Sequence, residues 1–267
     1  MIRSEDAHRV RLLTLDRPDQ LNAFNEALYD ATTDALTAAA DDRGIAVVII
    51  TGSGRAFSAG TDVIEMAARN TGDAVDGVHG FPGLIDQLVA FPKPLICAVN
   101  GLALGIGATM LGLADLVVMS REARIRCPFT ALAVAPEAAS SYTFPLLMGR
   151  QRATWALLSS EWMTAEECLE AGLAWKVCPP GSLLDEAMAA ARVLANKPLA
   201  SLLECKRTIT AAHRAAIGAA RERENLAFQR LMGQPANLEA LSALAERRTP
   251  DFAAVDAAHP VDVANHR

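Results

Sequence analysis

The sequence predicts an α/β fold, and three observations indicate it. Ala46–Thr51 and Leu95–Val99 are continuous, mostly apolar runs, which are typical of strands buried on both faces of a sheet. Segments with helical spacing alternate with these runs, as at Asn25–Ala40, where Asn25 is a suitable N-cap residue. Beyond Gly149 the pattern becomes mostly helical. The 267 residues therefore divide into an alternating part and a helical tail.

The other elements of the alternating part are shorter. Strands are expected at Val10–Leu15, Asp115–Ser120 and Arg124–Cys127, and helices at Leu84–Ala90 and Ala108–Leu113. The helix at Leu84–Ala90 should stop before Pro92, because a residue that precedes proline disfavours the helical conformation. Residues 67–80 lack periodicity and predict a mobile loop or an irregular helix.

The helical tail has recognisable boundaries. Thr164–Glu167 has the pattern of a capping box, and Gly172 is placed to end the helix that follows it. Further helices are expected at Ser182–Ala195, Leu199–Leu231 and Asn237–Arg248. Arg221–Arg230 alternates basic and acidic residues, which indicates a solvent-exposed helix face. We place a boundary after residue 196, giving a core of residues 1–196 and a helical region of residues 197–267 that we interpret as an oligomerisation module.

Composition excludes several classes of protein. The 25 basic and 31 acidic residues give a net charge of −6, which provides no electrostatic reason to expect a nucleic-acid partner. No apolar run reaches the ~18 residues of a membrane span, and the N-terminus lacks the apolar region of a signal peptide. The five cysteines form no CxxC pair and indicate reduced thiols in a cytoplasmic protein. The five scattered histidines give no metal-ligand spacing, so no metal site is expected.

Three familiar motifs fail on inspection. A dinucleotide-binding GxGxxG pattern would start at Gly105, but Met110 occupies the place of its third glycine. The phosphate-binding pattern GxxxxGK[ST] is missing from the sequence. Ser140 and Ser141 do not lie in GxSxG, and no histidine is placed to activate them. We therefore do not expect nucleotide binding or serine catalysis.

Two glycine-containing segments carry most of the functional information. Phe57–Asp62 and Asn100–Gly107 each follow an apolar strand and consist largely of small residues. Both are expected at turns from a strand to a helix, which is where α/β folds bind ligands. Such segments leave the backbone uncovered, so two of them can direct N–H groups at one point. That arrangement is an oxyanion hole, which stabilises negative charge on a carbonyl oxygen.

The order and sequence of these segments resemble the crotonase superfamily of enoyl-CoA hydratases and isomerases. The residues that carry the resemblance are the AFSAGTD and NGLALGIGA motifs, Arg17–Phe24, Asp115–Val118 and Lys197-Pro198. The resemblance covers nearly the whole chain. It implies a ClpP-like spiral of ββα units with a C-terminal helical region, and it implies homotrimers or hexamers made of two trimers. It also implies acyl-CoA thioester substrates, with CoA as part of the substrate and no separate cofactor.

The resemblance also assigns roles residue by residue. The N–H groups of Thr61 and Ile106 would be the two donors of the oxyanion hole. Residues that would contact the substrate are Ala23, Ser58, Ala59, Gly60, Asp62, Val63, Gly105 and Phe129. Among these, Phe129 would form a wall of the acyl pocket. The side chain of Asp62 has an alternative interpretation as a cap of the helix that follows it.

The acid–base group is the remaining part of the predicted site. Hydratases of the superfamily use two glutamates, and this chain has Thr109 and Phe129 at the matching positions. Glu137 lies in a segment that resembles the PEG-x-SSYTFP stretch of monofunctional, peroxisomal-type Δ3,Δ2-enoyl-CoA isomerases, with Ala138 in place of the glycine. In those enzymes this glutamate is the catalytic base. Its apolar surroundings predict a raised pKa, which suits proton abstraction. Alternatively, Pro136 and Glu137 open a helix.

Three functions are compatible with these residues. Isomerisation of a 3-enoyl-CoA thioester needs a single base and an oxyanion hole, and Glu137 with Thr61 and Ile106 would supply both. A hydratase with a different mechanism, or another crotonase-type enzyme such as an acyl-CoA hydrolase, is the second possibility. The third is a non-catalytic paralogue that binds CoA esters. The last two possibilities stay open because Thr109 and Phe129 stand where the hydratases have their two catalytic glutamates.

Overall fold

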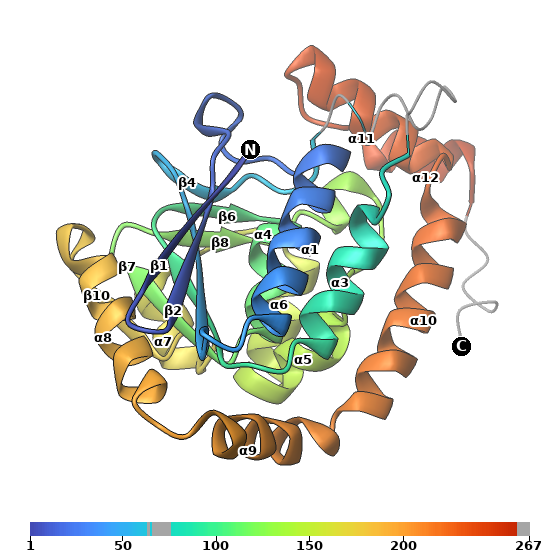
Figure 1. Ribbon diagram of the computed structural model, residues 1–267. Helices are drawn as coiled ribbons and strands as arrows, with labels where there is room; N and C mark the ends of the chain where they lie inside the picture. Colours follow the sequence, from blue (N-terminus) through green and yellow to red (C-terminus); the bar gives the residue numbers. More distant parts are fainter. Residues whose placement is uncertain (63–64, 66–75, 261–267) are drawn as a thin grey trace.

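Two β-sheets form the centre of the molecule, and helices surround them (Figure 1). The computed structural model describes residues 1–62, 65 and 76–260. The larger sheet has the order β1-β2-β3-β5-β7-β10, with strands at Ile2–Ala7, Val10–Leu15, Val47–Gly52, Leu95–Val99, Leu116–Ser120 and Lys176–Cys178. The smaller sheet has the order β4-β6-β8-β9, with strands at Ala56–Ser58, Leu102–Leu104, Arg124–Arg126 and Trp162–Thr164.

Helices connect many of the strands, and all the described elements that follow β10 are helical. The α-helices are α1 (Glu26–Asp41), α3 (Gly80–Ala90), α4 (Ile106–Thr109), α5 (Ser140–Met148), α6 (Arg150–Leu158), α7 (Ala165–Ala171), α8 (Leu183–Ala195), α9 (Leu199–Ala211), α10 (Arg214–Leu231), α11 (Pro235–Glu246) and α12 (Phe252–Ala258). Short 3₁₀ helices are η1 (Pro18–Gln20), η2 (Met110–Leu113), η3 (Thr130–Leu132) and η4 (Pro180–Ser182). In Figure 1, α9 passes below the sheets and α10 rises beside α5.

The chain winds as a spiral that passes repeatedly from one sheet to the other. β3, β5 and β7 are parallel neighbours in the larger sheet, and β4, β6 and β8, which follow them in the sequence, are parallel neighbours in the smaller one. A helix then leads back to the larger sheet after β4 and after β6. This arrangement confirms the predicted spiral of ββα units. It also places β4 and β6, which overlap the two glycine segments, side by side.

The central strands of the larger sheet are buried on both faces, as their continuous apolar sequences predict. On one face, Val47 and Ile49 of β3 and Ile96 of β5 pack against Ala187 and Ala191 of α8. The opposite face belongs to the main core, which includes residues of α1, α3 and the smaller sheet. Every residue of β5 is buried. The rigid sheet therefore fixes where the strand-to-helix turns lie.

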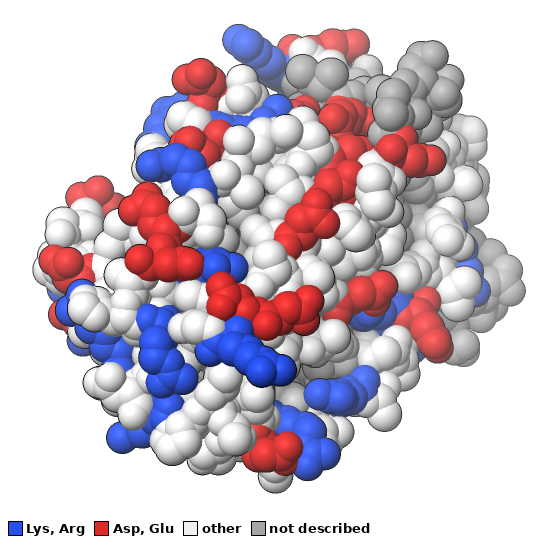
Figure 2. Space-filling view, viewed as in Figure 1, with Lys and Arg blue, Asp and Glu red and all other residues white. Residues whose placement is uncertain are grey.

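Helix α1 carries a row of acidic residues that anchors the start of α3. The row consists of Glu26, Asp30 and Asp34, which lie four residues apart along the helix. Figure 2 shows a band of acidic surface over the part of the face where α1 lies in Figure 1. The Asp30 carboxylate accepts N–H hydrogen bonds from Val78 (2.8 Å), His79 (2.7 Å) and Gly80 (3.0 Å), and these bonds lower the pKa of Asp30. A carboxylate from one helix thus caps another.

The structure differs from the expected elements in several places. The helix expected at Leu84–Ala90 starts earlier, at Gly80, because Asp30 satisfies its first N–H groups. The single helix expected at Leu199–Leu231 is broken at Ala212 and His213 into α9 and α10. Strand β1 was not expected, since most of its residues are exposed at the edge of the sheet. The segment expected to be a loop or irregular helix, residues 67–80, lies largely outside the described residues.

The remaining expectations concern helix ends and thiols. Asn25 caps α1 by accepting from the Leu28 N–H (3.0 Å), and Thr164 and Glu167 form the predicted capping box of α7. All five cysteines are free thiols, and Cys205 alone among them is exposed. Within the described part of the chain, no helix is long and apolar enough to cross a bilayer. No group of three or more potential metal-ligating His, Cys, Asp or Glu side chains occurs in that same part.

Candidate active site

The first glycine segment is held in place by residues that precede α1. The Phe24 N–H donates to Gly60 O (2.7 Å), and the Asp62 N–H donates to Phe24 O (2.8 Å). Phe24 and Thr61 thereby form an isolated parallel bridge. In such a bridge the N–H of Thr61 points away from Phe24. This N–H donates to no acceptor among the described residues, so it is available to a bound molecule.

The second glycine segment presents another N–H group. Gly105 lies between β6 and α4 at φ +49°, in the left-handed region that favours glycine. Ile106 is the first residue of α4, so its N–H has no acceptor within the helix. No other acceptor for it lies in the described part of the chain. The two predicted donors therefore both have unoccupied N–H groups.

The two segments and Glu137 converge at one place. A Cβ built on Gly105 would lie 3.7 Å from the Cα of Gly60, and a Cβ on Gly60 would lie 3.1 Å from Leu104 O. The same Cβ on Gly105 would lie 3.7 Å from Oε1 of Glu137. The structure thus brings a carboxyl group to the backbone that carries the Ile106 N–H. A thioester whose carbonyl oxygen bound there would have Glu137 beside it.

Glu137 has the electrostatic environment of a proton acceptor. Its carboxyl group is half-buried and makes no hydrogen bond or ion pair with any described residue. Burial raises its pKa to about 8, and the negative charge of Glu224 contributes further in the same direction. A carboxyl group with a pKa near the working pH is partly ionised. Its ionised form takes up a proton more readily than an ordinary carboxylate does, and it can release that proton again. Glu137 also raises the pKa of the Cys127 thiol, a smaller effect on that group than burial.

The raised pKa of Glu137 predicts a pH-dependent stability. Between about pH 4.5 and 8, the folded protein keeps a proton on Glu137 that the unfolded chain has lost, so its free energy of unfolding falls as pH rises. Glu137→Gln removes this effect, and we expect it to be increasingly more stable than the wild type from pH 5 to 8. The gain is at most a few kcal/mol, since one pKa unit corresponds to about 1.4 kcal/mol. Denaturant unfolding at several pH values measures it; a pH-independent difference would contradict the raised pKa.

The alternative in which Glu137 opens a helix does not match the structure. Helix α5 begins at Ser140, and its N-cap residue Ala139 provides no side-chain acceptor. No acidic residue lies in its first turn. Ala138 and Ala139 have φ angles of +57° and +59°, so the backbone turns sharply between Glu137 and the helix. The side chain of Glu137 is therefore directed by this turn rather than by a helix.

The predicted substrate-contacting residues fall into two groups. Gly60 and Gly105 lie at the convergence of the two segments, as described above. Ser58 is fully buried, and its hydroxyl donates to Asn22 O (2.9 Å). This hydrogen bond ties the first segment to the residues that precede α1. Ala59 belongs to the same segment, and its N–H donates to Leu21 O (2.9 Å). Ala23 precedes Phe24, which is bonded to that segment, and Ala23 O accepts from the Arg17 guanidinium (2.6 Å). Val63 lies outside the described residues.

The residues at the positions of the hydratase glutamates are both buried. Thr109 is 0% exposed, and its hydroxyl has no hydrogen-bond partner in the described part of the chain. Phe129 is 3% exposed and belongs to the main core. Neither side chain is ionisable, so Glu137 is the carboxyl group that the geometry brings to the two glycine segments.

Three further residues support the site and were not predicted. Tyr29 is hydrogen-bonded through its hydroxyl to Thr61 Oγ1 (2.8 Å). Arg17 forms an ion pair with Asp62 (3.3 Å), and its position in the Arg17–Phe24 motif was the available signal. Glu224 of α10 is 4% exposed, whereas its segment was expected to form a solvent-exposed helix face. That expectation is wrong for Glu224, and nothing in the local sequence distinguishes it from the exposed acids around it.

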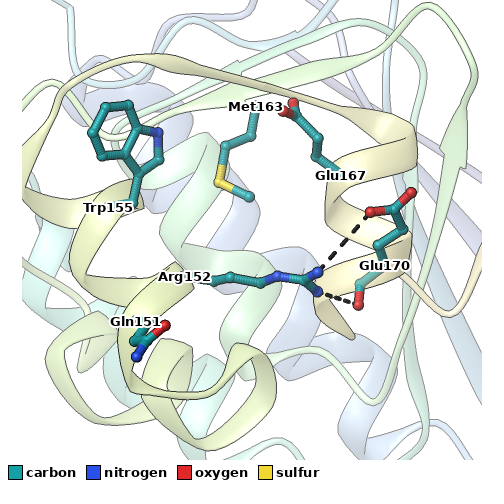
Figure 3. A pocket seen from close by; sticks show the side chains of 6 residues that line it. All are labelled: Gln151, Arg152, Trp155, Met163, Glu167 and Glu170. Carbon is teal, nitrogen blue, oxygen red and sulfur yellow. Dashed lines mark hydrogen bonds and ion pairs between the residues drawn. The ribbon is translucent and has the colours of Figure 1, made fainter.

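A surface cavity elsewhere contains none of these residues. It has a volume of about 370 Å³ and lies between α6, β9 and α7 (Figure 3). Arg152 points across it toward α7, where it forms an ion pair with Glu170 (4.0 Å). Arg152 and Glu170 pair with each other, and the Glu167 carboxylate accepts hydrogen bonds from Thr164, so the charged groups of this cavity are already engaged. None of the predicted site residues, Thr61, Ile106 and Glu137, lines it.

Comparisons with known proteins identify the family of the chain. Residues 5–255 match the model of the family described as enoyl-CoA hydratase/isomerase. The chain is 36% identical over 244 residues to the 2,3-dehydroadipyl-CoA hydratase of Escherichia coli K12, covering 91% of this chain and 95% of that protein. It is 35% identical over 248 residues to the 1,2-epoxyphenylacetyl-CoA isomerase of the same strain, covering 91% and 94%. A crystal structure of an enoyl-CoA hydratase from Mycobacterium marinum aligns with a TM-score of 0.75 and 60% identity, covering 78% of this chain and 98% of that chain.

The match extends over almost the whole chain and includes both sheets and the C-terminal helices. The two Escherichia coli relatives, at 36% and 35% identity, are covered over 95% and 94% of their length. The predicted resemblance to the crotonase superfamily is therefore confirmed. The chain belongs to the enoyl-CoA hydratase/isomerase family of enzymes.

Proposed function

We propose that this protein is a Δ3,Δ2-enoyl-CoA isomerase. It would move the double bond of an enoyl-CoA thioester from C3 to C2. The observation that carries the proposal is the position of Glu137, a carboxyl group with a raised pKa next to Gly105 and the free Ile106 N–H. The resemblance of the surrounding segment to isomerases of the peroxisomal type supports the same reaction.

The reaction requires one base and one site for negative charge. Ionised Glu137 removes a proton from C2, which both the thioester carbonyl and the adjacent double bond make acidic. The electron pair moves into the conjugated system, and the Thr61 and Ile106 N–H groups stabilise the resulting dienolate oxygen. The Glu137 carboxylic acid then returns the same proton at C4. Atoms and charge balance without another reactant, so we propose no cofactor beyond the CoA of the substrate.

Hydration is the second candidate, and two of the relatives described above favour it. They are the 2,3-dehydroadipyl-CoA hydratase of Escherichia coli and the enoyl-CoA hydratase of Mycobacterium marinum. A two-glutamate hydratase mechanism needs a second carboxylate at the site, and residues 109 and 129 do not provide one. Both oxygens of the buried Glu224 carboxylate accept backbone N–H groups, so that residue is engaged elsewhere. These contacts favour isomerisation over the two-glutamate mechanism.

Incubation with a 3-enoyl-CoA tests the proposal directly. We expect conjugated 2-enoyl-CoA to form, measured by its ultraviolet absorbance and by mass spectrometry, without addition of water. Parallel incubation with a 2-enoyl-CoA measures hydration as a gain of one water in mass. Faster hydration than isomerisation would support the second candidate instead. Binding of both thioesters without turnover would indicate a non-catalytic protein.

We further propose that the protein acts in the cytoplasm as a homotrimer or a hexamer. The helical region of residues 197–267 would contribute to the contacts between subunits. Large apolar side chains exposed on the single chain support an assembly, including Trp155 (60% exposed), Trp175 (53%) and Ile209 (70%). Light scattering coupled to size-exclusion chromatography measures the mass, and a monomer would contradict this part of the proposal.

A further inference from the structure

A buried carboxylate on α10 is hydrogen-bonded to the turn that carries Glu137. Glu224 is 4% exposed, and its oxygens accept from the Ala139 N–H (2.7 Å) and the Ser141 N–H (2.8 Å). No Lys, Arg or His in the described part of the chain forms an ion pair with it. Burying a carboxylate without a cationic partner is costly unless hydrogen bonds compensate it. Such an arrangement indicates that the contact has a specific role.

The contact replaces a helix cap that the local sequence lacks. Ala139 is the N-cap residue of α5 and has no side-chain acceptor, so the first N–H groups of the helix need another partner. Glu224 provides it from α10, and its negative charge is favourable at a helix N-terminus. The contact also holds Ala138 and Ala139 in the left-handed conformation, which is unfavourable for alanine.

This turn determines where the carboxyl group of Glu137 lies. Glu137 precedes the two left-handed alanines directly, and Glu137 O accepts from the Ser140 N–H (3.0 Å). A change in the turn would therefore rotate the base away from Gly105. We propose that Glu224 is a positioning residue for Glu137, so that α10 of the C-terminal region forms part of the active site. This inference rests on the proposed role of Glu137 as the base.

Glu224 also influences the protonation of Glu137. Its charge raises the pKa of Glu137 beyond the effect of burial, so removing that charge should lower it. The other titratable group coupled to Glu137 is the buried Cys127 thiol, whose own pKa is raised. Other charged or titratable groups near this contact are engaged elsewhere or exposed. Arg221 pairs with Asp86 of α3 (2.6 Å), and His213, which precedes α10, is hydrogen-bonded to the Tyr142 hydroxyl of α5 (2.8 Å). Glu222 and Arg223 of α10 are exposed.

Kinetics of three variants test the positioning role. Glu224→Gln keeps the shape of the side chain but removes its charge and one acceptor, and Glu224→Asp keeps the charge on a shorter side chain. Glu222→Gln is the matched control, because it removes an exposed charge from the same helix. For both Glu224 variants we expect kcat to fall about tenfold or more with little change in KM, since small displacements of a catalytic group are costly.

The pH profile separates positioning from a general loss of structure. For Glu224→Gln, the rise of kcat/KM with pH should move to lower pH than in the wild type, whereas for Glu224→Asp it should stay close to the wild-type position. Glu222→Gln should match the wild type in both quantities. If Glu224→Gln does not yield folded protein, as judged by circular dichroism, Glu224→Asp still tests kcat against KM. Values for the Glu224 variants within twofold of Glu222→Gln would overturn the inference.

Failure of the proposed function gives a different result. In that case the wild-type protein itself would not convert the 3-enoyl-CoA. If the wild type isomerises the substrate and the Glu224 variants match the control, only the positioning role fails. The stability difference between wild type and Glu137→Gln, measured again with Glu224→Gln in both proteins, should be smaller and should level off at lower pH, because a lower pKa of Glu137 in the folded protein narrows the pH range over which the difference grows. This measurement reports the coupling without any substrate.

Discussion

Glu137→Gln is expected to abolish isomerisation of a 3-enoyl-CoA while the protein remains folded and continues to bind thioesters. The same carboxyl group removes the C2 proton and returns it at C4, and glutamine can do neither. Loss of a general base typically lowers kcat by about 10²–10⁴-fold. The half-buried side chain makes no hydrogen bond in the described part of the chain, so the substitution breaks no structural contact. Steady-state kinetics across pH 6 to 9 would measure the loss (a range chosen to span the pKa of about 8).

The control for this prediction is binding. A saturated acyl-CoA has no double bond to move, so calorimetric titration with it reports affinity alone. We expect the dissociation constant of Glu137→Gln to stay within a few-fold of the wild-type value, because the predicted oxyanion donors are backbone groups. Isomerase activity of the variant close to that of the wild type would remove Glu137 from the mechanism. A parallel loss of affinity would indicate that the substitution disturbs the site more broadly.

The parts of the fold that were predictable from the sequence are those in which burial affects every residue of an element. β3 and β5 are buried on both faces, which requires an uninterrupted apolar run and makes them visible in the sequence. β1 lies at the edge of the sheet with mostly exposed residues, so nothing in its composition marks it as a strand. The break between α9 and α10 falls at Ala212 and His213, and neither residue is a helix breaker.

The same distinction applies to the candidate site. The glycine segments and Glu137 lie within short motifs, so their spacing was informative. Glu224 contacts Ala139, which is 85 positions away, and its immediate neighbours are exposed charged residues. A single buried acid in such a segment differs from a solvated one only through the tertiary contact. Helical periodicity locates α10, but it does not show which of its acids faces the turn after Glu137.

The second large effect is expected from removing one oxyanion donor, Ile106 N–H, by Ile106→Pro. A backbone N–H cannot be deleted by an ordinary side-chain change, but proline lacks it. Ile106 is the first residue of α4, where proline is well tolerated, and the preceding Gly105 has no Cβ to collide with the ring. Loss of one such donor typically lowers kcat by about 10²–10³-fold. We therefore expect a loss of that size in Ile106→Pro.

Ile106→Val is the matched control, because valine keeps the N–H and has the same number of side-chain carbons as proline. Ile106 is fully buried, so both variants lose similar packing, and Ile→Val costs about 0.5–1.5 kcal/mol of stability. Ile106→Val should retain activity within a few-fold of the wild type. If folded Ile106→Pro were as active as Ile106→Val, the Ile106 N–H could not be a donor to the dienolate oxygen. Comparison of the two variants thus separates the effect of losing the backbone N–H of residue 106 from the effect of making its side chain smaller.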